Sequence, residues 1–279
     1  MFTTNPFAAM SGVLPAGTMQ IYVVLAVLAV VAGVLIDIVH KGSARYFFAT
    51  WRKTAGQGSR PLGSGDMVAI AARTAVVDVL ASGEFCNPRR RVAHLLTMYG
   101  FVLYVVTTAL MVFAYPSAAS PAPALVPLLW WLGALMVCVG GYWFWFFIRV
   151  DVAAEGNTPW RLERADLFVV SLVGSVTLGL VWAFLQARSG APATWSFALY
   201  ILATTVLFGS VTWSKFAHMF FKPAAAFEKR VAEANGSALN LPTQSRDDPA
   251  QQQRHSMELL KDAPMHMGLG IKREAPRHY

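Results

Sequence analysis

Five long apolar stretches constrain the fold of this 279-residue chain more than any other feature of its sequence. A membrane span needs roughly 20 mostly apolar residues to cross about 30 Å of hydrocarbon. The stretches that meet this length are residues 19–40, 94–115, 125–150, 166–187 and 195–221. Unpaired backbone groups cannot face lipid, and the stretches lack the alternation of a barrel strand, so each is expected to be a helix. The sequence therefore predicts an all-α integral membrane protein built as a bundle of five transmembrane helices.

Basic residues are distributed unevenly between these stretches, which predicts the orientation of the chain. Residues 41–93 carry nine Lys or Arg, whereas residues 116–124 carry none. Connections rich in Lys and Arg stay in the cytoplasm, so we expect an N-out/C-in, multi-pass protein of the bacterial inner membrane. The net charge of +8 is then explained by orientation and lipid contacts, and we expect no nucleic-acid partner.

The parts outside the spans predict three regions. We expect a short periplasmic N-terminus over residues 1–18, a transmembrane domain over 19–223 with a cytoplasmic loop at 41–93, and a polar cytoplasmic tail over 224–279. The tail has too few apolar residues for a core and is expected to order only against a partner. Apolar periodicity predicts a short helix over residues 66–80, with Ser64 as its N-cap. That helix is interpreted either as a packing element or as a membrane-surface helix.

Two histidines, His94 and His218, lie at the predicted cytoplasmic ends of the second and fifth spans. Two imidazoles at equal depth on different helices suit bis-histidine ligation of a haem, which needs one axial nitrogen on each side of the iron. Arg89, Arg90, Arg91 and Lys215 are the candidates for pairing with haem propionates. Each histidine taken singly is equally well explained as an interfacial residue bonded to a backbone carbonyl.

Four further residues are candidates for roles in the membrane domain. Asp37 and His40 share a face at the end of the first span, where they are candidates for a quinone or proton site. The alternatives are that the two residues anchor the helix end, or that His40 replaces one of the iron ligands. Gly100 and Gly209 are expected to relieve crowding beside a macrocycle.

Three segments resemble the membrane b-haem subunits of the nitrate reductase gamma type. They are residues 89–101, which read Arg-Arg-Arg-Val-Ala-His-Leu-Leu-Thr-Met-Tyr-Gly-Phe, residues 164–168, Arg-Ala-Asp-Leu-Phe, and residues 215–223, Lys-Phe-Ala-His-Met-Phe-Phe-Lys-Pro. The resemblance covers residues 19–223. It is strongest to the sulfur-metabolism branch of the family, and within it to the membrane anchor subunits of dissimilatory adenylylsulfate reductase.

This resemblance implies a haem b, ligated by a histidine at the start of helix two and one at the end of helix five. His94 and His218 match those positions. The gamma subunit carries a second pair deeper in the same helices, but Tyr104 and Tyr200 lie roughly where such ligands would be sought. The resemblance therefore implies one haem at most.

The resulting expectation is a membrane anchor and electron-transfer subunit. It would link soluble cytoplasmic flavin and iron–sulfur subunits, of the adenylylsulfate reductase type, to the quinone pool, without substrate chemistry of its own. A haem-free structural anchor that recruits a soluble redox enzyme is the alternative, and the missing deeper histidine pair favours it. A transporter fits less well, because the spans show no paired Gly/Pro interruptions and no evident inverted repeat.

Overall fold

A computed structural model describes residues 2–40, 42–83, 85, 87–150, 158–188, 192–239 and 241. This part of the chain is helical and contains no strand. The chain divides into two units, each described by itself. The first unit comprises Met1–Ile36, Pro88–Phe144 and Leu162–Ala217, and the second comprises Asp37–Asn87, Trp145–Arg161 and His218–Tyr279.

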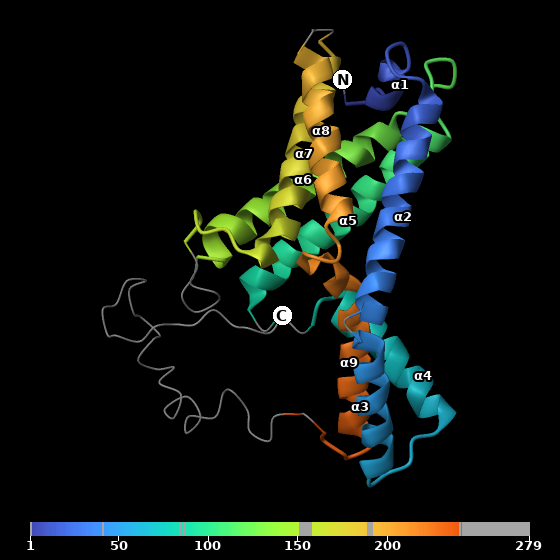
Figure 1. Cartoon of the computed structure of the whole chain (residues 1–279), viewed down its shortest axis with the longest axis vertical. Helices are drawn as coiled ribbons and strands as arrows, with labels where there is room; N and C mark the ends of the chain where they lie inside the picture. Colours follow the sequence, from blue (N-terminus) through green and yellow to red (C-terminus); the bar gives the residue numbers. More distant parts are fainter. Residues whose placement is uncertain are drawn as a thin grey trace, which may run out of the picture. The chain divides into compact units, whose positions relative to one another are not determined.

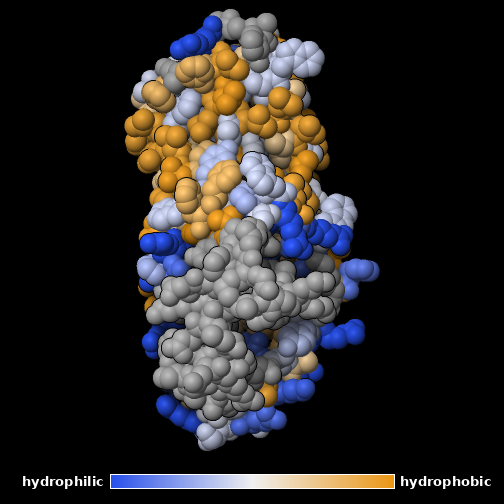
Figure 2. Space-filling view, turned by 90° about the vertical axis from the view of Figure 1, so that its left-hand side faces the viewer, coloured by the Kyte–Doolittle hydropathy of each residue, from blue (hydrophilic) through white to orange (hydrophobic). Residues whose placement is uncertain are grey.

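Within the described residues, four helical segments are long and apolar enough to cross a membrane, which confirms an all-α, multi-pass membrane protein (Figure 1). They are α2 (Ala16–His40), α5 (Pro88–Phe113), α6 (Leu125–Trp143) continued by the π-helical turn η2 (Phe144–Ile148), and the 3₁₀ turn η3 (Arg164–Asp166) continued by α7 (Leu167–Gln186). Figure 2 shows a broad hydrophobic area on the outside of the molecule, as lipid contact requires.

The fifth apolar stretch is divided, where the sequence predicts one span over residues 195–221. Helix α8 (Pro192–Gly209) ends early, and the short 3₁₀ helix η4 (Lys215–Ala217) precedes a new helix, α9 (His218–Ala234). Hydroxyl side chains in residues 210–214 compete for backbone partners, and Ser214 Oγ accepts a hydrogen bond from the Phe216 amide at 3.2 Å. The helix therefore stops although the residues beyond it are still largely apolar.

At several glycines of the first unit, α5 and α6 approach each other without a large side chain between them. A methyl group added at Gly100 of α5 would lie 2.7 Å from the carbonyl oxygen of Gly133 and 2.8 Å from the amide nitrogen of Val137, both on α6. One added at Gly140 would lie 2.6 Å from the Ala93 carbonyl oxygen. Small residues are the usual means by which helices approach in lipid, because lipid supplies no hydrophobic force between them.

A short N-terminal helix, α1 (Pro6–Met10), covers one end of the first unit. Asn5 caps this helix, since its Oδ1 accepts hydrogen bonds from the Phe7 and Ala8 amides. The Asn5 Nδ2 donates to the carbonyl oxygens of Met111 and Tyr115, where α5 ends. One amide thus satisfies groups at the beginning of one helix and the end of another. We call this side of the first unit the Asn5 end.

The second unit contains α3 (Ser43–Gln57), α4 (Ser64–Arg73), the π-helix η1 (Thr74–Leu80) and α9. The helix predicted over residues 66–80 is confirmed as α4 and η1, although Gly63 rather than Ser64 is the N-cap. Helix α3 was not predicted. The tail, expected to lose structure after Pro223, is helical to Ala234 and contains that proline within α9.

Aromatic and polar contacts join the helices of the second unit. Trp51 of α3 stacks on Phe227 of α9 with ring centroids 5.7 Å apart. Asn235 Nδ2 donates to the Thr54 carbonyl oxygen at 2.8 Å, and the Arg60 amide donates to the Asn235 carbonyl oxygen at 3.1 Å. The loop between α2 and α5 and the beginning of the tail therefore fold together.

An ion pair joins η1 to α9 in the same unit. Both Arg230 Nε and Arg230 Nη2 donate to the carboxylate of Asp78, in the two-pronged geometry that suits a guanidinium and a carboxylate. The hydrogen bonds from Arg230 hold the pKa of Asp78 below its ordinary value, against the opposing effect of burial.

Candidate functional site

His94 lies in the second turn of α5, in the first unit, with its side chain half-buried. Its neighbour Ala93 faces α6 at the Gly140 contact. One residue turns a helix by about 100°, so His94 is directed away from that contact. Helical spacing places Met98 and Phe101 on the same face as His94. The imidazole therefore belongs to an apolar, half-buried face of a membrane-length helix.

His218 is the first residue of α9, in the second unit, and its side chain is also half-buried. The division of the fifth stretch thus changes the setting of this residue, because His218 begins an amphipathic helix instead of ending a span.

The two histidines belong to different units, and each unit contributes one imidazole. Arg90, Arg91 and Lys215 are half-buried in the first unit, whereas Arg89 is exposed. The chemistry of these residues fits a b-type haem, because imidazoles ligate the iron and cations pair with the propionates.

Of the two glycines expected beside a macrocycle, Gly100 has a different role. The absence of a side chain at Gly100 allows α5 to approach α6. The backbone of Gly133 and Val137 therefore occupies the space beside this glycine. A methyl group at Gly209 would meet no described atom within 4 Å. The expected role beside a macrocycle therefore stays a prediction for Gly209 alone.

Tyr104 and Tyr200 lie together deeper in the first unit. The Tyr104 hydroxyl donates to the Tyr200 hydroxyl at 3.2 Å. Tyr104 stacks on Trp130 with centroids 5.0 Å apart, and Tyr200 stacks on Trp182 with centroids 5.6 Å apart. All four rings are buried. We call these residues the aromatic layer, and they fill the position where the resemblance places a second pair of haem ligands.

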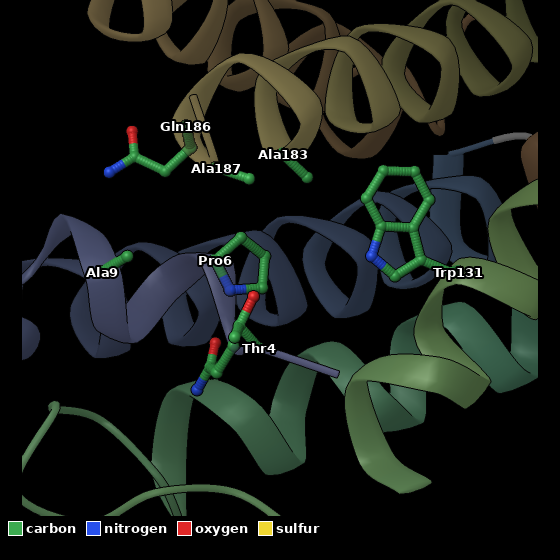
Figure 3. A pocket seen from close by; sticks show the side chains of 8 residues that line it. Thr4, Pro6, Ala9, Trp131, Ala183, Gln186 and Ala187 are labelled. Carbon is green, nitrogen blue, oxygen red and sulfur yellow. The ribbon is translucent and has the colours of Figure 1, made fainter. Parts of the chain in front are cut away.

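A small cavity lies beyond the aromatic layer, at the Asn5 end. Its volume is about 40 Å³, and Figure 3 shows the side chains that line it from α1, α6 and α7. Among the described residues, buried Trp131 Nε1 has no hydrogen-bond partner, and the Trp131 side chain lines this cavity. A cavity of this size holds a few water molecules at most. It is too small for a haem or for a quinone ring.

Asp37 and His40 lie in the last turn of α2, within the second unit. The Asp37 side chain is buried, with 6 % of its surface exposed, whereas His40 is exposed. Ser43 Oγ donates to the Asp37 carbonyl oxygen at 3.3 Å, which ties the end of α2 to the beginning of α3. The carboxyl group of Asp37 is therefore buried, whereas the imidazole of His40 is in contact with the surroundings.

Arg149 is a buried residue for which the sequence predicted no role in the site. It has no exposed surface, and its guanidinium donates to the carbonyl oxygens of Thr158 at 2.8 Å and Arg161 at 2.5 Å. The guanidinium also lies over the Trp145 ring, 4.3 Å from the centroid. The spacing of four residues between Trp145 and Arg149 is the only sequence signal for this contact.

The described residues contain no group of three or more His, Cys, Asp or Glu side chains suited to a metal ion. A haem bound by two imidazoles needs no such group, since the porphyrin supplies the remaining ligands. No family model, no curated protein and no solved structure matches this chain.

Proposed function

We propose that this chain is a membrane anchor and electron-transfer subunit that connects a soluble cytoplasmic oxidoreductase to the quinone pool through one haem b. The soluble enzyme is of the flavin and iron–sulfur type, with adenylylsulfate reductase as the first candidate. In this proposal the chain lies N-out/C-in in the bacterial inner membrane, and α8 is the fifth span. Its 18 residues extend about 27 Å, which is close to the hydrocarbon thickness.

The observation that carries the proposal is the position of the two histidines along the chain. His94 follows the first residue of α5 by six positions, and His218 follows the last residue of α8 by nine. The C-terminal ends of α5 and α7 both lie at the Asn5 end. The beginning of α5 and the C-terminal end of α8 therefore lie on the opposite side of the first unit. Both imidazoles therefore come from the same side of the membrane in the proposed topology.

Each residue has a stated role in this proposal. His94 and His218 hold the iron, and Arg90, Arg91 and Lys215 hold the propionates. The bound haem would accept and release one electron at a time. Asp37, buried in the last turn of α2, would give a proton to quinone on its reduction or take one from quinol on its oxidation, and His40 would exchange that proton with water. The aromatic layer keeps the opposite half of the bundle closed.

The test is a reduced-minus-oxidised absorbance spectrum of the purified full-length protein in detergent. Wild type should show the α-band of a b-type haem, with a stoichiometry of one haem per chain. His94→Ala and His218→Ala should each lose the band, because a bis-histidine haem needs both ligands. The matched control is His40→Ala, which removes an exposed imidazole from the end of α2 and should retain the band.

Two results would contradict the ligand assignment. A lost band in His40→Ala with a retained band in His94→Ala or His218→Ala would make His40 a ligand. Absence of the band in wild type that elutes as a monodisperse species would reject the haem. Gel filtration of every variant separates the loss of a ligand from the loss of the fold.

A haem-free structural anchor is the second candidate, and the aromatic layer is the observation that favours it. Four buried rings occupy the deeper position, so the first unit is closed there without any cofactor. A folded second unit would recruit the soluble enzyme equally well in either case. The same spectrum distinguishes the two candidates, because only the first requires a b-type band.

A further inference from the structure

The cavity at the Asn5 end has a buried floor and an exposed rim. Of the residues that line it, Pro6, Trp131 and Ala183 are buried, whereas Thr4 and Ala187 are exposed. The described residues of the lining include no charged side chain. A ligand of this cavity is therefore expected to be neutral and to enter from the end of the helices.

The indole N–H of Trp131 points into the cavity. Figure 3 shows the ring nitrogen on the side of Trp131 that faces Pro6. The Trp131 side chain has 8 % of its surface exposed, and its Nε1 has no hydrogen-bond partner among the described residues. Edge contacts with Phe2, at 5.0 Å between centroids, and with Trp130, at 5.6 Å, hold the ring in this orientation. A buried donor without a partner is unfavourable, so the position of this N–H indicates an acceptor inside the cavity.

The size and the lining of the cavity limit what that acceptor is. Its volume of about 40 Å³ exceeds the roughly 10–15 Å³ that a water molecule needs. Asn5 is already satisfied, because its Oδ1 accepts from two backbone amides and its Nδ2 donates to two carbonyl oxygens. The Thr4 hydroxyl and the Gln186 amide are the other polar side chains of the lining, and each can accept a hydrogen bond. Together with Trp131 they supply the polar partners that a buried water requires.

We propose that this cavity binds an ordered water molecule, which accepts a hydrogen bond from Trp131 Nε1 and donates to Thr4 and Gln186. The water joins the segment before α1 to α6, which carries Trp131, and to α7, which carries Gln186. It acts beside Asn5, whose amide ties the same segment to the end of α5. The site is independent of the proposed function, because none of its residues is a proposed ligand of the haem.

Trp182 provides an internal comparison for Trp131. Its side chain has no exposed surface, and its Nε1 also lacks a hydrogen-bond partner among the described residues. The Trp182 ring stacks on Tyr200 in the aromatic layer and does not line the cavity. The proposal therefore separates two otherwise similar indoles, one bonded to water and one dry.

The experiment records cross-relaxation between indole protons and water by NMR, in full-length protein with ¹⁵N-labelled tryptophan in detergent. Trp131→Phe and Trp182→Phe each remove one indole signal, which assigns these two among the nine tryptophans. The Trp131 N–H should show a cross-peak to water, and the Trp182 N–H should show none. Trp160, assigned in the same way and 86 % exposed, is the positive control.

A second variant fills the cavity. Ala183→Val adds apolar volume at the buried floor and should displace the water. The cross-peak of Trp131 to water should then be lost, and its indole proton should shift upfield because the hydrogen bond is lost. Ala187→Val, the same substitution on the exposed rim, is the matched control and should retain both signals. Gel filtration of each variant separates loss of the water from loss of the fold.

Several outcomes would overturn the proposal. Absence of the Trp131 cross-peak in folded wild type would show that the cavity is dry. A cross-peak to acyl or headgroup protons in place of water would assign the cavity to a lipid or a detergent molecule. Equal cross-peaks for Trp131 and Trp182 would show that water enters the bundle without a specific site. A cross-peak retained in folded Ala183→Val would place the water outside the cavity.

Discussion

Helices of the first unit meet through glycines and aromatic rings, whereas those of the second unit meet through an amide, an ion pair and one aromatic stack. At the contact between α5 and α6, Gly100 and Gly133 bring backbone against backbone. Between η1 and α9, Arg230 makes two hydrogen bonds to Asp78. In lipid, helices associate through close packing of small residues, and a charged side chain is costly. At a surface exposed to water, paired charges carry no such cost.

The comparison also shows that hydropathy alone does not predict which helices pack. Helices α2 and α6 are both strongly apolar, yet 11 % of the most apolar window of α2 is buried against 50 % for the segment containing α6. The α6 sequence has glycines at positions 133, 140 and 141, and each meets a neighbouring helix. In α2, Gly33 meets Val211, while a methyl group added at Gly17 would meet no described atom within 4 Å. Glycines that face a neighbour, rather than apolar content, distinguish the packed helix.

The largest effect is expected at the α5–α6 contact. Gly100→Ala places a methyl group against the backbone of Gly133 and Val137, which cannot move without separating the helices. Overpacking of this kind costs about 1–3 kcal/mol, and occasionally more. The thermal unfolding temperature of the purified protein in detergent should fall clearly.

Gly174→Ala is the matched control for this prediction. Gly174 lies within α7, and an added methyl group would meet no described atom within 4 Å. A substitution away from such contacts changes stability by about 0.5 kcal/mol or less. Equal losses in the two variants would mean that helix flexibility, and not close approach, explains the glycines of the first unit.

A more local effect, confined to η1 and α9, is expected from the ion pair of the second unit. Arg230→Ala leaves the partly buried carboxylate of Asp78 without its two donors, which costs about 1.5–3 kcal/mol. Hydrogen exchange of the η1 and α9 amides should accelerate, while that of α5 and α6 stays unchanged. Lys229→Ala is the control, because its contact with Glu233 is exposed and 4.0 Å long. Exchange as fast in the control as in Arg230→Ala would show that the pair contributes little.

The pH dependence of the same pair has a defined sign. The hydrogen bonds from Arg230, with smaller contributions from the charges of Lys229 and Arg73, lower the pKa of Asp78 in the folded protein. Its stabilising effect is therefore complete above the unfolded value of about 3.9 and is lost as the pH falls through the folded value. The amide exchange rates of wild type and Asp78→Asn should differ at about pH 7 and should converge below about pH 4. A constant difference over this range would assign the effect to packing.

The sequence predicted the parts of the fold that depend on the length and period of apolar runs. The lengths of the apolar stretches predicted four membrane-length helices, and the periodic spacing of apolar residues predicted the helix over residues 66–80. Helix α3 was missed because its buried Thr54 and its half-buried Phe47 and Trp51 lie among the exposed aromatic residues Tyr46 and Phe48. The end of α8 was missed because apolar residues continue beyond Gly209.

The candidate site was predictable only in part, for a related reason. His94 was placed correctly at the beginning of a membrane-length helix, because that position depends on sequence neighbours alone. The burial of Arg149 depends on carbonyl oxygens nine and twelve residues away, and no local pattern encodes those contacts. The position of His218 depended on where α8 stops, which the hydroxyl residues of 210–214 decide.

The smallest effect is expected in the aromatic layer, where the first unit contains a hydrogen bond between side chains of α5 and α8. Tyr200→Phe removes the acceptor of the Tyr104 hydroxyl but keeps the ring that stacks on Trp182. Hydrogen bonds between membrane helices contribute about 0.6 kcal/mol on average, so the loss should be well below that of Gly100→Ala. A double-mutant cycle with Tyr104→Phe, followed by unfolding in detergent, isolates the coupling between the two hydroxyls. A coupling above about 2 kcal/mol exceeds what such bonds usually contribute in membranes, and the first unit would then depend on polar contacts as much as the second.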